Sequence, residues 1–173
     1  MVTPKKDVQT VTPEGERIAN RIDGVEVRLA ITHVDERGEL CEIYNPVWDF
    51  AKGPFPYVYM TTLRPHKIRG WVVHREQQDR LFVALGALKI VLYDARPESP
   101  TFKVINEFYL GERNRGSVSI PQNVFHAVQN VGDVEGVFIN CPTKPYNHAN
   151  PDKLRLPLDT DEIPYKFGDN RGW

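Results

Sequence analysis

The chain has 173 residues, 40% of them hydrophobic, and its 22 Lys and Arg residues nearly balance 23 Asp and Glu residues, which leaves a formal net charge of −1. No block of basic residues stands out, so the composition argues against nucleic acid or a membrane surface as the main partner. A chain of this length buries roughly 70% of its extended surface on folding, so we expect one domain with its own core.

The sequence shows no sign of export or of membrane insertion. The N-terminus lacks the apolar core of a signal peptide, and no apolar run approaches the ~18 residues of a membrane-spanning helix. Cys41 and Cys141 are far apart and form no CxxC pair, as expected for free thiols in a reducing compartment. We therefore expect a cytoplasmic protein with no membrane partner.

Residues 1–22 are expected to form an N-terminal segment with one helix signal. In the stretch from Thr12 to Ala19, Thr12 precedes Pro13, which is the order of an N-cap residue and a proline at the first helical position. We predict one short helix here.

From Val25 onward, short runs rich in Val, Ile, Leu, Phe and Tyr are separated by turn-forming residues, a texture typical of a sandwich or closed barrel. We expect an all-β barrel over residues 23–145, with Leu85-Gly86-Ala87 as a hairpin turn. The predicted strands are Val25–Val34, Leu40–Tyr44, Pro56–Leu63, Gly70–His74, Arg80–Leu85, Leu88–Asp94, Val104–Leu110, Gly116–Ile120, His126–Asn130 and Glu135–Cys141.

The end of the chain has a different composition. It is rich in proline and polar residues from Pro142 onward. We expect residues 146–173 to be an arm that packs on the barrel and belongs to the same domain.

The stretch from Arg69 to Val83 carries the densest polar chemistry in the chain. Because side chains alternate between the two faces of a strand, Gly70, Val72 and His74 should share one face and Trp71 the other. We therefore expect Trp71 to serve in packing, and we expect His74 to point into the barrel if Val72 does.

Two half-motifs follow one another along the chain. The first contains Gly70, His74, Asp79 and Gly86, and the second contains the run Gly116, Pro121, Asn123, His126 and Asn130. Together they resemble the paired motifs of the cupin superfamily. The resemblance implies a double-stranded β-helix, or jelly-roll barrel, with the side chains of both motifs in one cavity.

A closer resemblance, over roughly residues 24–145, is to the dTDP-4-dehydrorhamnose 3,5-epimerase family within that superfamily. It rests on the order of the segments Asp35-Glu-Arg-Gly38, Arg69-Gly70-Trp71, Arg80-Leu-Phe-Val, Leu92-Tyr-Asp-Ala-Arg96-x2-Ser99-Pro100-Thr101 and Ile120-Pro121-x4-His126. The family implies a homodimer that works without a metal or other cofactor on a nucleotide-linked 4-keto sugar. Its base is a histidine assisted by an aspartate, and its acid is a tyrosine.

The resemblance also assigns the residues that hold the ligand. Arg37 and Glu42 match a segment that reaches into the partner subunit's site and holds the nucleotide. Arg69 and His126 match residues near the diphosphate, and Arg80 stands at a usual lysine, where its guanidinium fork suits a diphosphate. Tyr146 is expected at the rim of the barrel.

The catalytic positions depart from the family pattern. Val72 stands where the base histidine is expected, and Asn140 where the tyrosine acid is expected. His74 is the natural replacement base, because histidine titrates near neutrality. Asp79 either orients His74 or pairs with Arg80. Three tyrosines could act as a relocated acid, and the sequence does not choose among Tyr57, Tyr59 and Tyr93.

Three functions follow from this pattern. The first is a sugar-nucleotide epimerase or isomerase with His74 as base. The second is a metal-dependent cupin that binds Fe(II), Mn or Zn through His74, Asp79 and His126. The third is a protein that binds a sugar nucleotide or carbohydrate without turning it over.

Overall fold

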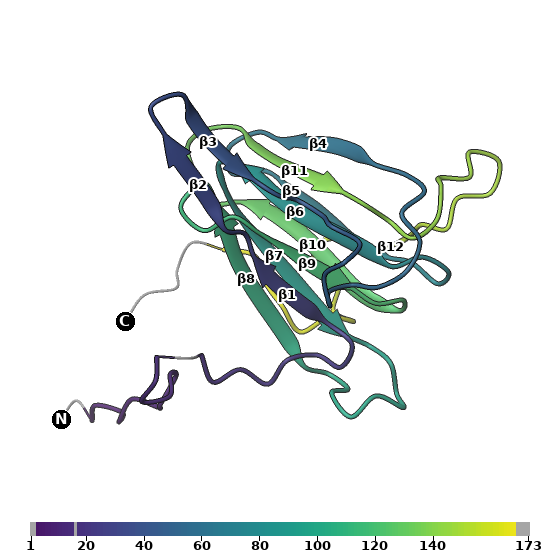
Figure 1. The fold of residues 1–173 in the computed structure, drawn as a ribbon. Helices are drawn as coiled ribbons and strands as arrows, with labels where there is room; N and C mark the ends of the chain where they lie inside the picture. The colour runs from purple at the N-terminus through teal and green to yellow at the C-terminus, as the bar shows by residue number, and fades with distance from the viewer. Residues whose placement is uncertain (1–2, 16, 169–173) are drawn as a thin grey trace.

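The computed structural model describes residues 3–15 and 17–168, and regular structure in this part of the chain consists of β-strands (Figure 1). The all-β prediction is confirmed, and no helix among the described residues is long and apolar enough to span a membrane. The strands are β1 (Glu26–Leu29), β2 (Thr32–Asp35), β3 (Gly38–Cys41), β4 (Tyr59–Leu63), β5 (Ile68–Val73), β6 (Asp79–Leu85), β7 (Ala87–Asp94), β8 (Ile105–Gly111), β9 (Gly116–Ile120), β10 (Val124–Asn130), β11 (Gly136–Asn140) and β12 (Leu154–Arg155).

Two antiparallel five-stranded sheets form the body of the molecule. One has the strand order β1-β9-β6-β11-β4 and the other β12-β5-β10-β7-β8. From β4 to β7 each strand lies in the sheet opposite to that of the strand before it, so segments that are neighbours in sequence face one another across the interior.

This alternation makes the expected hairpin at Leu85-Gly86-Ala87 wrong. β6 and β7 are separated by Gly86 alone and lie in different sheets. A tight hairpin needs about two loop residues, so a single residue cannot return the chain beside itself. Gly86 instead adopts a positive φ of 75° and turns the chain from one sheet to the other.

The main core fills the space between the sheets, and strand alternation supplies it. Leu88, Ile90 and Leu92 of β7 are fully buried in this cluster, whereas Val91 and Tyr93 of the same strand belong to a second buried cluster on the other face. Strand β7 is therefore covered on both faces.

The second cluster lies beneath the C-terminal arm. Trp71 has no exposed surface, and its ring packs edge-on against Tyr165 at a centroid distance of 5.9 Å, with Phe167 at 5.4 Å. Ile163 is also buried there. The packing role expected for Trp71 is confirmed, and the arm covers the outer face of the sheet that carries β5.

The predicted N-terminal helix is wrong. Thr12 accepts a hydrogen bond from the Gly15 amide at 3.0 Å, and Val11 forms an antiparallel bridge with Arg17. Thr12, Pro13 and Gly15 stand at positions one, two and four of a turn, where proline and glycine are favoured. The signals that suggest a helix start here belong to a tight turn, since no apolar face follows to stabilise a helix.

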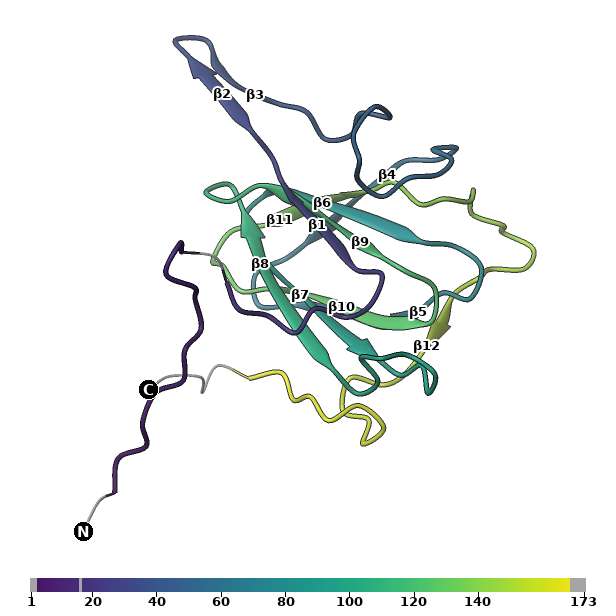
Figure 2. The ribbon, with the colours of Figure 1, turned by 60° about the horizontal axis from the view of Figure 1, so that its bottom comes forward.

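The expected strand Val25–Val34 is divided into two strands with different partners. β1 pairs with β9 in the body, whereas β2 pairs with β3 in a separate two-stranded ribbon that projects from it (Figure 2). Gly38 has a φ of 137° at the turn of this ribbon, a conformation that favours glycine. The ribbon carries exposed apolar side chains, including Val34 and Leu40.

The segment that follows β7 is organised by one buried carboxylate. Asp94 is fully buried, and its oxygens accept hydrogen bonds from the Arg96 side chain at 2.8 Å, from Ser99 Oγ at 2.6 Å and from Thr101 Oγ1 at 2.7 Å. Burial opposes the charge of Asp94, but these donors outweigh it and hold the pKa of this carboxyl below its usual range. The motif from Leu92 to Thr101 therefore has a structural role.

Replacing this carboxylate should destabilise the fold. Asp94→Asn places an amide group against donors that need an acceptor, and we expect the free energy of unfolding at pH 7 to fall by about 3 kcal/mol. Urea unfolding measures this change. Glu98→Gln, in the same loop but exposed, is the matched control and should change stability by less than about 0.5 kcal/mol.

The effect should also depend on pH. Because the folded pKa of Asp94 is depressed, its contribution is complete well above the unfolded value of about 3.9 and is lost as the pH falls below it. The gap between wild type and Asp94→Asn should shrink at low pH. An unchanged gap at pH 3 would show that the carboxylate charge does not stabilise the loop.

Candidate active site

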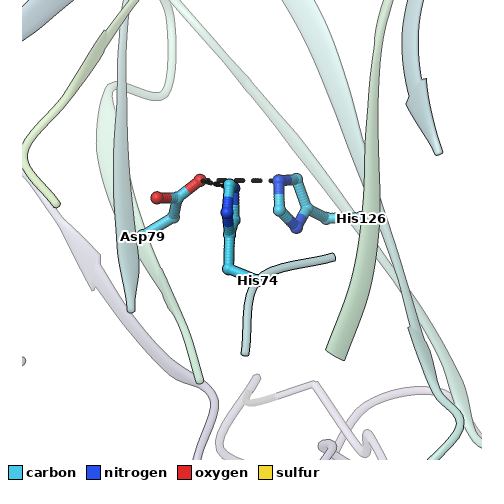
Figure 3. Close-up of side chains that lie close together, drawn as sticks. All are labelled: His74, Asp79 and His126. Carbon is cyan, nitrogen blue, oxygen red and sulfur yellow. Dashed lines mark ion pairs between the residues drawn. The ribbon is translucent and has the colours of Figure 1, made fainter. Parts of the chain in front are cut away.

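Three buried side chains converge between the sheets (Figure 3). Asp79 Oδ2 lies 3.3 Å from Nε2 of His74 and 3.5 Å from Nε2 of His126. The two imidazole rings are 5.5 Å apart and inclined by 28°. The sequence predicts this cluster, and the structure brings all three residues together.

The strand order explains why they meet. Asp79 begins β6 in one sheet, whereas His74 directly follows β5 and His126 lies in β10, both in the other sheet. His126 is the register partner of Val72, so it lies beside β5. The Asn123 amide donates to the His74 carbonyl at 2.7 Å, which ties the end of β5 to the start of β10.

A cavity of about 90 Å³ opens beside the cluster. Gly70, Val72 and His74 line it, as alternation along the strand predicts. Arg69 lines it too, although strict alternation places it on the opposite face, because the pairing of β10 with β5 shifts register between His126 and Val128. The other lining residues are Tyr59, Thr61, Asp79, Leu81, His126, Val128, Phe138, Lys153 and Arg155.

Asp79 is the charged centre of the cluster. Burial acts to raise the pKa of its carboxyl, but its interactions with His74, His126 and Asn140 outweigh burial and lower the pKa well below the usual range. Gln77 Nε2 donates to its Oδ1 at 2.7 Å, a contact with no sequence signal beyond its position two residues away. Asp79 is therefore ionised at neutral pH.

Asp79 acts to raise the pKa of both histidines, but the net shifts of the two are opposite. Burial lowers the pKa of His126 to about 4 despite the nearby charge of Asp79, so this imidazole is neutral. Burial also acts to lower the pKa of His74, but Asp79 and the contact with Asp152 outweigh it and raise the pKa above its ordinary value. Of the two histidines, His74 is therefore the one whose pKa lies nearer to neutral pH.

The C-terminal arm fixes which nitrogen of His74 exchanges the proton. His74 Nδ1 is hydrogen-bonded to the Asp152 carbonyl, and because that oxygen only accepts, Nδ1 carries a hydrogen. Nε2, which faces Asp79, is then the nitrogen that gains or loses a proton. The Asp152 carboxylate in turn accepts from the amides of Arg75, Glu76 and Gln77 at 2.8–3.0 Å.

The arm also brings two cations to the cavity that the sequence does not identify. Lys153 and Arg155 line it, and burial, with Arg155 adding to it, lowers the pKa of Lys153. They arrive there because β12 pairs with β5, with Arg155 opposite Val72. In the sequence they are basic residues in a proline-rich segment without clear periodicity, and this alone does not mark them as site residues.

Asn140 and Arg80 are close to the cluster. Asn140 is fully buried, accepts from the Arg80 amide at 3.0 Å through Oδ1 and donates through Nδ2 to the Tyr59 hydroxyl at 2.8 Å. The Arg80 guanidinium instead donates to the carbonyls of Pro54 and Lys52 at 3.1 and 3.2 Å. Arg80 does not line the cavity, so its contact with a ligand stays a prediction.

Three other predicted site residues lie outside the cavity. Arg37 is exposed at the tip of the β2–β3 ribbon, where it pairs with Asp35. Glu42 is exposed just after β3, with Asn45 at 3.4 Å. Tyr146 is 41% exposed and stacks edge-on with His148. The structure of the single chain does not bring them to the cluster.

The raised pKa of His74 can be tested directly. Asp79→Asn removes the charge that outweighs burial, so we expect the pKa of His74 to fall below its wild-type value. Titration of the imidazole resonances by NMR measures the change. Asp133→Asn, which removes an exposed carboxylate 3.4 Å from His66, is the control and should leave the His74 titration unchanged. An equal His74 pKa in wild type and Asp79→Asn would contradict this electrostatic account.

Known proteins resemble this chain in both sequence and structure. A sequence model of the dTDP-4-dehydrorhamnose 3,5-epimerase family matches residues 19–173. A probable low-salt glycan biosynthesis epimerase, Agl13, from Haloferax volcanii is 34% identical over 139 residues, which cover 80% of this chain and 89% of that protein. The spore coat polysaccharide biosynthesis protein SpsL from Bacillus subtilis is 31% identical over 150 residues, 84% of this chain and 96% of that protein.

Among solved structures, a dTDP sugar isomerase from Desulfovibrio desulfuricans superposes with a TM-score of 0.78 at 23% identity, over 84% of this chain and 91% of that one. This likeness confirms the expected cupin fold. The match of the family model over most of the chain, together with the two relatives above 30% identity, shows that this protein belongs to the dTDP-4-dehydrorhamnose 3,5-epimerase family.

Proposed function

We propose that the protein is a sugar-nucleotide epimerase of glycan or polysaccharide biosynthesis, and that it inverts a carbon next to the ketone of a nucleotide-linked keto-sugar. Its family and the names of its relatives, which include a probable glycan biosynthesis epimerase and a polysaccharide biosynthesis protein, support this function. The nucleotide that we expect is dTDP, because the family and the similar solved structure are both named for dTDP-sugars.

The observation that carries the proposal is the His74–Asp79 pair at the cavity wall. A hydrogen on a carbon next to a ketone is removed by a base whose pKa is near the working pH, and histidine meets this condition. The ionised Asp79 stabilises the imidazolium that forms when His74 accepts the proton. His74 is therefore the base and Asp79 the residue that supports it.

The charges around the cavity favour an anionic ligand. Arg69, Lys153 and Arg155 line it, and Asp79 is the only carboxylate among the lining residues. The cavity, at about 90 Å³, is smaller than the roughly 300–1,000 Å³ of a typical ligand pocket, so the reacting edge of a sugar would enter while the nucleotide stays outside. The diphosphate would then lie at the cationic mouth, where guanidinium groups bind phosphate oxygens in pairs.

Arg37 and Glu42 lie outside the cavity of their own chain, as they would in a homodimer where each chain contacts the ligand of its partner. Arg37 and Glu42 lie in and after a ribbon that projects from the body of its own chain (Figure 2). Exposed Val34 and Leu40 on this ribbon provide apolar surface that a second copy would cover. We propose that the ribbon reaches the partner's site, where Arg37 and Glu42 would contact the nucleotide, in a cytoplasmic dimer.

Exchange of substrate hydrogen with solvent tests the proposal. In D2O the enzyme should incorporate deuterium into a dTDP-4-keto-6-deoxy-sugar, and His74→Ala should slow this incorporation by about 10²–10⁴-fold because the base is lost. NMR or mass spectrometry of the recovered sugar measures it. His66→Asn, which replaces an exposed histidine outside the cavity, is the matched control and should exchange at the wild-type rate.

The same experiment separates the epimerase from a protein that only binds. A wild-type protein that binds dTDP but exchanges no hydrogen of any keto-sugar offered would contradict the catalytic function. It would favour the non-catalytic alternative.

A second candidate is a metal-dependent cupin, and one observation favours it. The ligand atoms of His74, Asp79 and His126 all lie within 4.8 Å of one another, and two imidazoles with one carboxylate suit Fe(II), Mn or Zn. His74 Nδ1 is held by a carbonyl, as is usual for metal-binding histidines. The epimerase proposal expects substoichiometric metal in elemental analysis of the purified protein, with activity kept after chelation. A full equivalent of metal, lost together with activity in EDTA, would favour the metal enzyme.

A further inference from the structure

Inversion of a carbon requires proton transfer on both of its faces. A base removes the proton from one face, and a donor must return a proton to the opposite face. His74 follows β5 in the sheet that contains β10 and β7. A donor on the opposite face of a bound sugar should therefore come from the facing sheet.

Five residues of the facing sheet line the cavity: Tyr59, Thr61, Asp79, Leu81 and Phe138. Two of them have side chains that titrate, Tyr59 and Asp79. Asp79 is ionised and is occupied by the two histidines, so it has no proton to give. Tyr59, in β4, is the group of this wall that carries a transferable proton.

The hydrogen bonds around Tyr59 leave that proton free. Asn140 is the register partner of Tyr59 across β11 and β4. Because Asn140 Oδ1 accepts from the Arg80 amide at 3.0 Å, its Nδ2 is the atom that meets the Tyr59 hydroxyl, at 2.8 Å. The hydroxyl oxygen therefore accepts from Asn140, and its own hydrogen remains for a ligand in the cavity.

The electrostatics keep this proton in place until it is needed. Burial raises the pKa of Tyr59 to about 12, and the charge of Asp79 adds to the effect. The phenol is thus fully protonated at neutral pH. Arg69, which acts to lower this pKa, lines the same cavity and would help to stabilise a phenolate formed during turnover.

We propose that Tyr59 is the proton donor of the epimerisation, acting on the face of the sugar opposite to His74, and that Asn140 positions its hydroxyl. The assignment rests on the proposed function. His74 Nε2 takes the proton from the carbon, and the C–H electron pair forms the enolate, with the charge on the former carbonyl oxygen. The enolate then reforms the carbonyl as its carbon bonds the Tyr59 proton. The resulting phenolate regains a proton from solvent, and His74 releases its proton to solvent.

Tyr59→Phe separates the two proton transfers in the full-length protein. The base still removes the substrate proton and returns a solvent deuteron to the same face, so deuterium incorporation should stay within a few-fold of wild type. Formation of the inverted sugar should fall by about 10²–10⁴-fold because the donor is missing. The probe is a dTDP-4-keto-6-deoxy-sugar in D2O, with exchange and configuration both read by NMR.

Tyr57→Phe is the matched control. Tyr57 packs against Tyr59 with ring centroids 5.5 Å apart but does not line the cavity, so its substitution should preserve both exchange and inversion. Retained exchange in Tyr59→Phe also shows that the site is folded.

Two outcomes would overturn the assignment. Inversion by Tyr59→Phe at the wild-type rate would show that another group donates the proton. Equal loss of exchange and inversion, with wild type active, would show that Tyr59 is needed before the carbon is protonated. Absence of exchange in wild type is a different result, since it contradicts the epimerase function itself.

Discussion

The candidate site depends on one buried carboxylate held between two imidazoles. Asp79 reaches the interior from β6, and both histidines reach it from the facing sheet, so their contacts with Asp79 link the two halves of the barrel. A carboxylate in such a position is costly unless it is paired and hydrogen-bonded. Two histidines and Gln77 contact it directly. Burial keeps His126 neutral despite this charge, whereas Asp79 raises the pKa of His74.

The C-terminal arm completes the site from outside the barrel. It covers Trp71 on the outer face of the sheet, and through Asp152 it fixes the ring of His74 on the inner side. It also brings Lys153 and Arg155 to the cavity. Packing of the arm and orientation of the base are therefore coupled, since one segment supplies both. Loss of the arm's apolar contacts would release the histidine as well as expose Trp71.

The sequence predicts much of the barrel and the centre of the site because strands have a strict period. Alternation placed His74 beside Val72 on the cavity face and Trp71 on the packing face, and both assignments hold. The predictions that were wrong or missing concern segments without the regular period of a strand. The turn at Thr12–Gly15 has the residues of a helix start, and Lys153 lies in an irregular segment that only its pairing with β5 brings to the site. Tyr59 could not be chosen over two other tyrosines because its contact with Asn140 joins strands far apart in sequence.

In the mechanism that we propose, His74 and Tyr59 face one reacting carbon from opposite sheets. A crystal structure with a bound dTDP-4-keto-6-deoxy-sugar or a close analogue would show whether both groups reach that carbon. The carbon next to the ketone should lie about 3–3.5 Å from His74 Nε2 on one face and at a similar distance from the Tyr59 hydroxyl on the other. A sugar bound with that carbon against Val72 and out of reach of both groups would contradict this mechanism.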